Sequence, residues 1–324
     1  MKRNILIAGI LLFSLLLISG CISQSQSVNK TESPSITTTT SSASTEKEPE
    51  FIAISAGTRH NLALRNNGTV SAFCIYNRKA VCTVPSNLTD VIAVSAGDHY
   101  SLALKRDGTI VFWGMPDAHQ QIPTLANSTE FSNIIAISTG TAHSLILKKD
   151  GTVVAKGSTK CGACDVPTDL TNVTAISAGH VHSMALKDDG SVIAWGNCKG
   201  DIYTEYGQAD VPDNLTNVIA VSAGGLHSLA LKSDGTVVAW GSNNYGQADV
   251  PDNLTNVIAI SAGGLHSLAL KSDGTVVAWG QNEVGQCNVP ENLSDVIAIS
   301  AGGVQSLALK NDGTVVEWGM KSFP

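Results

Sequence analysis

The sequence predicts an all-β fold, a ring of seven blades with four short antiparallel strands each. Three observations carry this prediction. The phrase at residues 257–280 recurs seven times along the chain, no copy shows helical periodicity, and glycine or Asp-Gly turn signals separate its short apolar segments. Repeats of this kind bury their apolar faces against one another, and a closed ring leaves only short strand edges exposed. The expected architecture is therefore a seven-bladed β-propeller.

The copies begin at residues 51, 91, 134, 173, 218, 257 and 296, and together they fill residues 51–324. In the sixth copy, residues 257–262 alternate branched and small residues, as an inner strand in a crowded position does. Residues 267–270 form a second strand, and Asp273-Gly274 turns the chain into a third strand at residues 275–279. Residues 285–290 predict a weaker outermost strand, because Pro290 cannot donate to a ladder.

The last copy ends soon after Trp318, so its fourth strand is missing. Either residues just before Phe51 or the C-terminal tail complete this blade, or it has three strands.

Two columns of residues recur in register. A tryptophan column is expected to fill the gaps between blades; its members are Trp113, Trp195, Trp240, Trp279 and Trp318. The first copy has Phe73 at this position. The third copy has Lys156 there, so its contact with the neighbouring blade is expected to be the loosest. A histidine column is interrupted by Tyr100 and Gln305, and no carboxylate stands beside it. We expect it to cap backbone groups of the turn or of the neighbouring blade rather than to bind a metal; its members are His60, His143, His182, His227 and His266.

With these columns in place, the pattern G-x-x-H-S-L-A-L-K-x-D-G-T-V-x-A-W-G resembles the regulator of chromosome condensation repeat over residues 51–324. The resemblance implies a β-propeller. That family includes nucleotide exchange factors, chromatin binders and a secreted bacterial inhibitor of β-lactamases, and the Val-Pro between blades makes these repeats most similar to those of the inhibitor.

The N-terminus predicts export. Residues 1–20 combine a short positive start with an apolar run that is too short to span a membrane. Leu17 to Cys21 resembles a prokaryotic lipobox, so Cys21 is the expected lipid attachment site; the alternative is an ordinary signal peptide with an incidental Cys21. Residues 21–50 are rich in Ser and Thr and predict a disordered linker. The mature protein is expected outside the cytoplasmic membrane of a prokaryote, anchored by lipid.

The other cysteines fit an oxidising compartment. Cys74 and Cys82 form a plausible local disulfide. Cys161 and Cys164 have redox or metal-ligand spacing, but without a second pair a strained disulfide or plain thiols are favoured over zinc. Cys198 and Cys287 are expected to stay free.

Composition excludes several functions. A formal net charge of -7 and no basic run in the repeats argue against a nucleic-acid partner. The recurring Asp residues are explained by hairpin turns, so we expect no catalytic residues, no metal site and no cofactor, and the protein is predicted not to be an enzyme.

The two faces of the ring differ. Loops joining strands one to two and three to four share a first face and vary between copies, which indicates either a binding surface or drift; candidate binding residues are Arg59, His99, His180, Lys199, Tyr203, Glu205, Tyr206 and Tyr245. The second face carries every Asn-x-Ser/Thr triplet of the repeats as a candidate glycosylation site, at Asn67, Asn87, Asn127, Asn172, Asn214, Asn253 and Asn292.

The expected function is that of a monomeric, lipid-anchored binding module that recognises a protein or a surface glycan. The resemblance gives inhibition of an extracellular enzyme such as a β-lactamase as the alternative. A guanine-nucleotide exchange factor is less favoured, because its GTPase partner would lie on the other side of the membrane.

Overall fold

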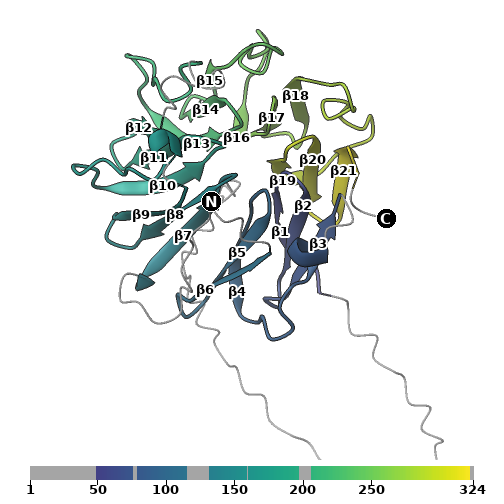
Figure 1. The fold of residues 1–324 in the computed structure, drawn as a ribbon. Helices are drawn as coiled ribbons and strands as arrows, with labels where there is room; N and C mark the ends of the chain where they lie inside the picture. Colours follow the sequence, from purple (N-terminus) through teal and green to yellow (C-terminus); the bar gives the residue numbers. More distant parts are fainter. Residues whose placement is uncertain (1–48, 76–78, 115–130, 159, 197–205, 322–324) are drawn as a thin grey trace, which may run out of the picture.

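The computed structural model describes residues 49–75, 79–114, 131–158, 160–196 and 206–321. Seven three-stranded antiparallel sheets, blades 1 to 7, follow one another along the chain (Figure 1). Their strands are β1 (Phe51–Ala56), β2 (His60–Arg65), β3 (Val70–Cys74), β4 (Val91–Ala96), β5 (Tyr100–Lys105), β6 (Ile110–Gly114), β7 (Ile134–Thr139), β8 (His143–Lys148), β9 (Val153–Gly157), β10 (Val173–Ala178), β11 (Ser183–Lys187), β12 (Val192–Trp195), β13 (Val218–Ala223), β14 (His227–Lys232), β15 (Val237–Gly241), β16 (Val257–Ala262), β17 (His266–Lys271), β18 (Val276–Gly280), β19 (Val296–Ala301), β20 (Gln305–Lys310) and β21 (Val315–Gly319). Two single turns of helix, α1 (Lys79–Cys82) and η2 (Lys160–Gly162), lie between blades.

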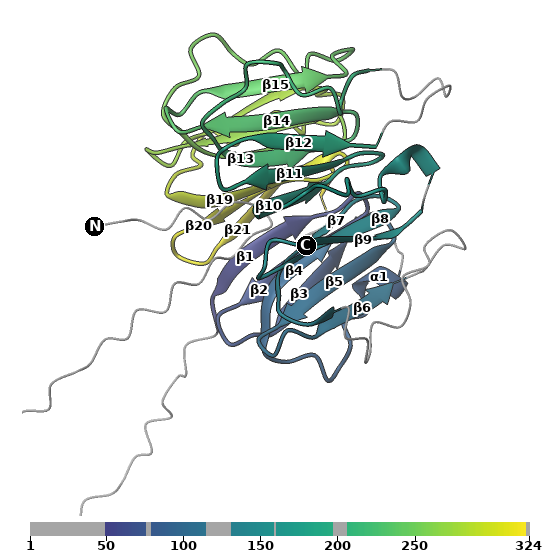
Figure 2. The ribbon, with the colours of Figure 1, turned by 90° about the vertical axis from the view of Figure 1, so that its left-hand side faces the viewer.

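The blades form a closed ring. The first strand of each blade packs against the first strand of the next, and β1 of blade 1 packs against β19 and β20 of blade 7. In Figure 1 the last blade therefore lies beside the first, although they stand at opposite ends of the repeat region. Figure 2, turned by 90°, shows β7 and β10 of consecutive blades next to one another. The predicted seven-bladed all-β propeller is confirmed.

The expectation of four-stranded blades is wrong for the described residues, where every sheet has three strands. The connector between blades 5 and 6 shows why. Its backbone bonds close locally, from Asp249 N to Gly246 O at 3.1 Å and from Leu254 N to Pro251 O at 3.0 Å. Pro251 has no N–H to give to a ladder. The segment therefore runs as tight turns, and blade 7 is a three-stranded blade like the others.

The apolar core lies between the blades. One cluster joins Leu145 and Leu147 of blade 3 to Ile176 and Trp195 of blade 4. The other six clusters join neighbouring blades in the same way, and the last one joins blade 7 to blade 1. The predicted role of the tryptophan column is confirmed. Each ring of this size buries about 150–250 Å², so removing one is expected to cost about 3–5 kcal/mol.

Four of the five tryptophans also carry a polar contact, whereas Trp318 Nε1 has no hydrogen-bond partner among the described residues. Trp240 Nε1 donates to the backbone oxygen of Gln208, and Trp279 Nε1 donates to that of Gln247, both at 3.0 Å. Each connector is thereby fixed to the outer side of the blade that follows it. Where blade 3 has Lys156, its ammonium group lies 5.9 Å from the centroid of the Phe131 ring.

The hairpin between the second and third strands explains the repeated Asp-Gly pair. Asp234 Oδ1 accepts hydrogen bonds from Thr236 N at 3.0 Å and from Thr236 Oγ1 at 2.6 Å. These bonds lower the pKa of Asp234 to about 2. Gly235 follows at φ 82°, a conformation that glycine adopts without steric cost. The aspartate column thus shapes the turn.

All seven seams between blades share one polar contact along the inner strands. The serine at the fifth position of each inner strand accepts a hydrogen bond from the backbone N–H at the sixth position of the next inner strand. The distances are 2.9 to 3.0 Å at every seam, including the one from Ala56 of blade 1 to Ser300 of blade 7. The ring is closed by the same bond that holds its other blades together.

The seam between blades 7 and 1 has a further contact of its own. Asn61 is fully buried; its Nδ2 donates to Glu317 Oε1 at 2.8 Å, and its Oδ1 accepts from Gln305 Nε2 at 3.0 Å. Gln305 Nε2 also donates to the backbone oxygen of Gly57 at 2.8 Å. Blades 2 to 7 have serine at the position of Asn61. We call Asn61, Gln305 and Glu317 the seam triad.

Candidate binding face and channel mouth

The histidine column is buried between the blades. His266 Nε2 lies 2.9 Å from Ser306 Oγ, and that hydroxyl donates its single proton to the backbone oxygen of Gln286 at 2.8 Å. The imidazole must therefore donate, which places its proton on Nε2. The other four histidines make the same contact to the next blade at 2.7 to 2.9 Å. The column bridges blades, as expected, but through a serine side chain rather than through backbone groups.

Burial keeps these imidazoles neutral. The loss of solvation lowers the pKa of His182 and His227 to about 3, and that of His60, His143 and His266 to about 4. All five are at most 1% exposed. A ligand in the channel has no access to them, so the column stabilises the fold.

The two residues that interrupt the column fulfil the same role. Tyr100 Oη donates to the backbone oxygen of His143 at 2.6 Å and lies 2.9 Å from Ser144 Oγ. Burial raises the pKa of Tyr100 well above its usual value. Gln305 takes the corresponding place at the last seam, as part of the seam triad.

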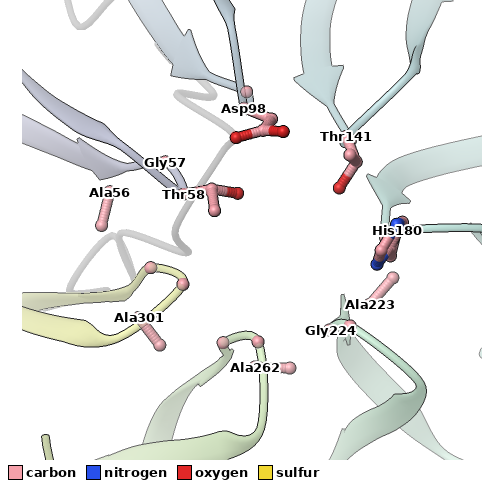
Figure 3. A pocket seen from close by; sticks show the side chains of 18 of the residues that line it. Ala56, Gly57, Thr58, Asp98, Thr141, His180, Ala223, Gly224, Ala262 and Ala301 are labelled. Atoms are coloured by element: carbon pink, nitrogen blue, oxygen red, sulfur yellow. The ribbon is translucent and has the colours of Figure 1, made fainter. Parts of the chain in front are cut away.

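A hollow of about 510 Å³ opens at the first face, where the seven inner strands end. In blades 5 to 7 each inner strand is followed by two glycines, as at Gly224-Gly225. In blades 1 to 4 the second glycine is replaced by a polar residue: Thr58, Asp98, Thr141 and His180. Figure 3 shows these four side chains at one side of the opening, whereas Ala223, Ala262 and Ala301 lie on the other. We call this hollow the mouth, and the four side chains the polar arc.

Asp98 is the centre of charge in the polar arc. Its Oδ1 accepts from Arg59 Nε at 2.7 Å, and its Oδ2 lies 3.3 Å from His99 Nε2. The side chain of Asp98 is only 12% exposed, so these partners stabilise a carboxylate that has lost most of its water. Partial burial lowers the pKa of His180, and the nearby Asp98 opposes the shift. His180 is therefore neutral at pH 7.

The opposite side of the mouth is mainly apolar, with Gln281 as its polar residue. Leu226, Leu265 and Val304 line it beside the paired glycines and the alanine methyl groups. A Cβ on Gly264 would lie 2.6 Å from the backbone oxygen of Gly303, so the close approach of neighbouring turns requires glycine there. The mouth is thus divided between a polar half and an apolar half.

A ring of backbone hydrogen bonds around the mouth is broken at one seam. At six seams the residue after the turn glycine donates to the corresponding glycine of the next blade, as from Gly225 N to Gly263 O at 2.9 Å. Between Asp98 N and Gly140 O this bond is not formed among the described residues. The break lies in the polar arc and leaves one backbone donor and one acceptor at the mouth.

The predicted binding residues are only partly brought together. Arg59 and His180 line the mouth, and His99 joins them through Asp98. Tyr245 lies farther out on the same face and is 48% exposed, and Tyr206 is half-buried. Lys199, Tyr203 and Glu205 lie outside the described residues. The sequence reasoning did not single out Thr58, Asp98 or Thr141, although their shared replacement of a repeated glycine was a visible signal.

The second face carries the hairpin tips and the connectors. Hydrogen bonds from Val91 N to Gly68 O and from Val218 N to Gly190 O join the two. Six of the seven candidate glycosylation asparagines are described, and all six are exposed: Asn67, Asn87, Asn172, Asn214, Asn253 and Asn292. Asn127, like Cys21 and the predicted signal and linker, lies outside the described residues. Glycosylation of this face stays a prediction.

The cysteines are distributed as follows. Cys74 and Cys82 form a disulfide, and Cys161 is disulfide-bonded as well. Cys164 is free, so the expected option of a Cys161–Cys164 disulfide is wrong. Free Cys164 and Cys287 donate to the backbone oxygens of Ser158 and Gln281 at 3.3 and 3.2 Å. Burial raises the pKa of both thiols to about 11.

The described part of the chain contains no group of three or more His, Cys, Asp or Glu side chains placed to hold a metal ion. None of its helices has the length and apolar character needed to cross a membrane.

Known proteins resemble this chain in part of its sequence and in its fold. The family model for the regulator of chromosome condensation (RCC1) repeat matches residues 173–197, 218–247 and 257–286. No curated protein matches the chain in sequence.

Solved structures of the same fold include Prp20p from Saccharomyces cerevisiae, at 19% identity over 81% of this chain and 84% of that one, with a TM-score of 0.66. The ectodomain of the Physcomitrella patens receptor kinase CR4 is 18% identical over 84% of this chain and 74% of that one, with a TM-score of 0.66. That of the Arabidopsis thaliana receptor kinase ACR4 is 18% identical over 85% and 99%, with a TM-score of 0.63. At such identities the likeness establishes the fold. The matched segments carry RCC1 repeats, and the chain folds as a β-propeller like these structures.

Proposed function

We propose that the protein is a lipid-anchored binding module outside the cytoplasmic membrane, which recognises a protein or a surface glycan through its first face. The polar arc carries this proposal. The histidine, serine, tryptophan and aspartate columns are occupied by contacts within or between blades. Thr58, Asp98, Thr141 and His180 replace glycine at the rim of a hollow, at positions where blades 5 to 7 carry no side chain.

The comparisons support the coarse part of this proposal. RCC1-like propellers are generally protein-interaction modules, and Prp20p is described by its binding to Gsp1p and histones. Two of the similar structures are ectodomains of receptor kinases. An ectodomain lies outside the membrane, and the predicted lipid attachment at Cys21 would hold this chain outside the membrane as well.

Site-specific photocrosslinking on intact cells tests the proposal. A photoreactive amino acid is introduced at Thr141 on the first face, and at exposed Thr255 on the second face as the matched control. We expect adducts from position 141 and none from position 255. Adducts from position 255 alone, or from neither position, would contradict binding through the first face.

Membrane anchoring is tested separately. Cys21→Ser removes the proposed lipid attachment site, so the variant is expected in the soluble fraction or the medium, whereas the unaltered protein stays with the membrane. If the unaltered protein is soluble, the anchor does not exist.

Inhibition of a β-lactamase is the second candidate. The apolar half of the mouth, with Leu226, Leu265 and Val304, is the feature that a protein ligand would use. The assay adds purified propeller at about 1 μM to a β-lactamase, a concentration that would reveal binding of micromolar affinity or tighter. An unchanged hydrolysis rate removes this candidate.

A further inference from the structure

We propose that the mouth binds one neutral sugar unit, the end of a surface glycan, with its hydroxyl edge against the polar arc and its C–H face against the apolar half. The inference rests on the proposed function, because it names the ligand class of the same face. Three properties of the mouth lead to it: its balance of charge, its supply of hydrogen-bonding groups and its two-sided lining.

The balance of charge disfavours an ionic ligand. Asp98 is the one acidic residue among those that line the mouth, and Arg59 neutralises it at 2.7 Å. His99 approaches the other carboxylate oxygen at 3.3 Å, and His180 is neutral at pH 7. A cation would have to compete with Arg59, and an anion would meet Asp98. A neutral ligand meets neither penalty.

The hydrogen-bonding groups suit hydroxyls. Thr58 and Thr141 place hydroxyls at the mouth, a group that can both donate and accept, and neutral His180 has one donor and one acceptor. Among the described residues the His180 imidazole has no hydrogen-bond partner of its own, so it is available to a ligand. The broken backbone ring adds the N–H of Asp98 and the oxygen of Gly140 at the same edge. Several alternating donors and acceptors converge on one side.

The opposite side suits the C–H face of a sugar ring. Alanine methyl groups, paired glycines and the side chains of Leu226, Leu265 and Val304 form it. Figure 3 shows Ala223, Ala262 and Ala301 on this side, and Gln281 is the polar residue that lines it. The volume of about 510 Å³ falls within the range of about 300–1,000 Å³ typical of small-molecule sites. Among the described residues no Phe, Tyr or Trp side chain lines the mouth, so we expect a weak interaction, with a dissociation constant of about 1 mM.

Saturation-transfer NMR on the purified protein tests the inference. The probes are glucose, galactose, mannose, N-acetylglucosamine and N-acetylgalactosamine, with glucuronic acid and glucosamine as charged comparators. We expect saturable transfer to at least one neutral sugar and weaker transfer to both charged ones. Thr141→Val removes a hydroxyl from the mouth at nearly constant volume and should weaken binding about tenfold, whereas Thr255→Val on the second face should leave it unchanged.

Three results would overturn the inference: no saturable transfer from any neutral sugar up to about 20 mM, tighter binding of a charged sugar, or equal binding by the Thr141→Val and Thr255→Val proteins. Asp98→Asn is a second variant for the case in which Thr141→Val does not fold, and it should weaken sugar binding as well. Failure of the sugar inference is distinguishable from failure of the proposed function. Protein adducts from position 141 without any sugar binding would refute sugar binding at the mouth but would still support a binding module that acts through the first face.

Discussion

The seam triad makes a quantitative prediction about how the ring is held closed. Asn61→Ser gives blade 1 the residue that the other blades carry, but the shorter side chain does not reach Glu317 or Gln305. The variant loses a hydrogen bond of 2.8 Å to a carboxylate and one of 3.0 Å to an amide. Bonds to charged groups contribute about 1.5–3 kcal/mol and neutral ones about 1 kcal/mol.

The expected loss is smaller than that sum. Glu317 is only partly buried, so water replaces some of its lost bonding, and Gln305 keeps its bond to Gly57 at 2.8 Å. We therefore expect the free energy of unfolding to fall by about 2–3 kcal/mol. The melting temperature should fall by roughly 4–12 °C, at about 2–4 °C per kcal/mol for a domain of this size.

Urea unfolding followed by tryptophan fluorescence measures the effect. Glu317→Ala and the double variant complete a mutant cycle, in which the double variant should lose about 1–2 kcal/mol less than the sum of the singles. Glu283→Ala, an exposed glutamate on the connector before blade 7, is the charge control. Asn61→Ser within 0.5 kcal/mol of the unaltered protein, or a cycle without coupling, refutes a role of the triad in ring closure.

The remaining predictions concern the buried columns. The five histidines have folded pKa values of about 3 to 4 and an unfolded value near 6.5. Because the folded pKa values are lower, the stability that these histidines contribute is fully present above about pH 6.5 and is lost as the pH falls toward about 4. The loss is up to roughly 1.4 kcal/mol per pH unit for each histidine. A urea midpoint that is constant from about pH 7 to 4.5 would contradict this prediction. His227→Gln should cost less than His227→Ala, since Gln305 already fills the column with an amide, and equal midpoints in urea would show that the polar bridge is unimportant. Burial raises the pKa of Cys287 to about 11, so iodoacetamide should label it far more slowly in the folded protein than in urea, and equal rates would show that the thiol is accessible.

Much of the fold was predictable because its signals are periodic and local. Seven copies in register specify seven blades, and the Asp273-Gly274 turn is set by residues next to one another in sequence. The fourth strand was predicted incorrectly because the sequence of an extended Val-Pro segment does not determine which groups its backbone will hydrogen-bond. In the structure that segment closes its own turns and gives the oxygen of Gln247 to Trp279 of the next blade.

The candidate site was predictable only in outline. The variable loops between the first and second strands marked the right face, and Arg59 and His180 do line the mouth. The grouping of Thr58, Asp98 and Thr141 at one side follows from ring closure, which brings together residues that are about forty positions apart. No local pattern in the sequence predicts that these residues lie close together.

The sequence by itself determined the number of blades, the small inner strands, the hairpin turns and the wedge tryptophans, because each depends on residue type at a position that recurs in every copy. Only the tertiary structure decided which atoms each column contacts, how the ring closes at Asn61 and Glu317, and which half of the mouth is polar. The physical reason is that each blade buries its side chains against the next one. The contacts between blades therefore join residues about a full repeat apart or, at the closing seam, residues from opposite ends of the ring.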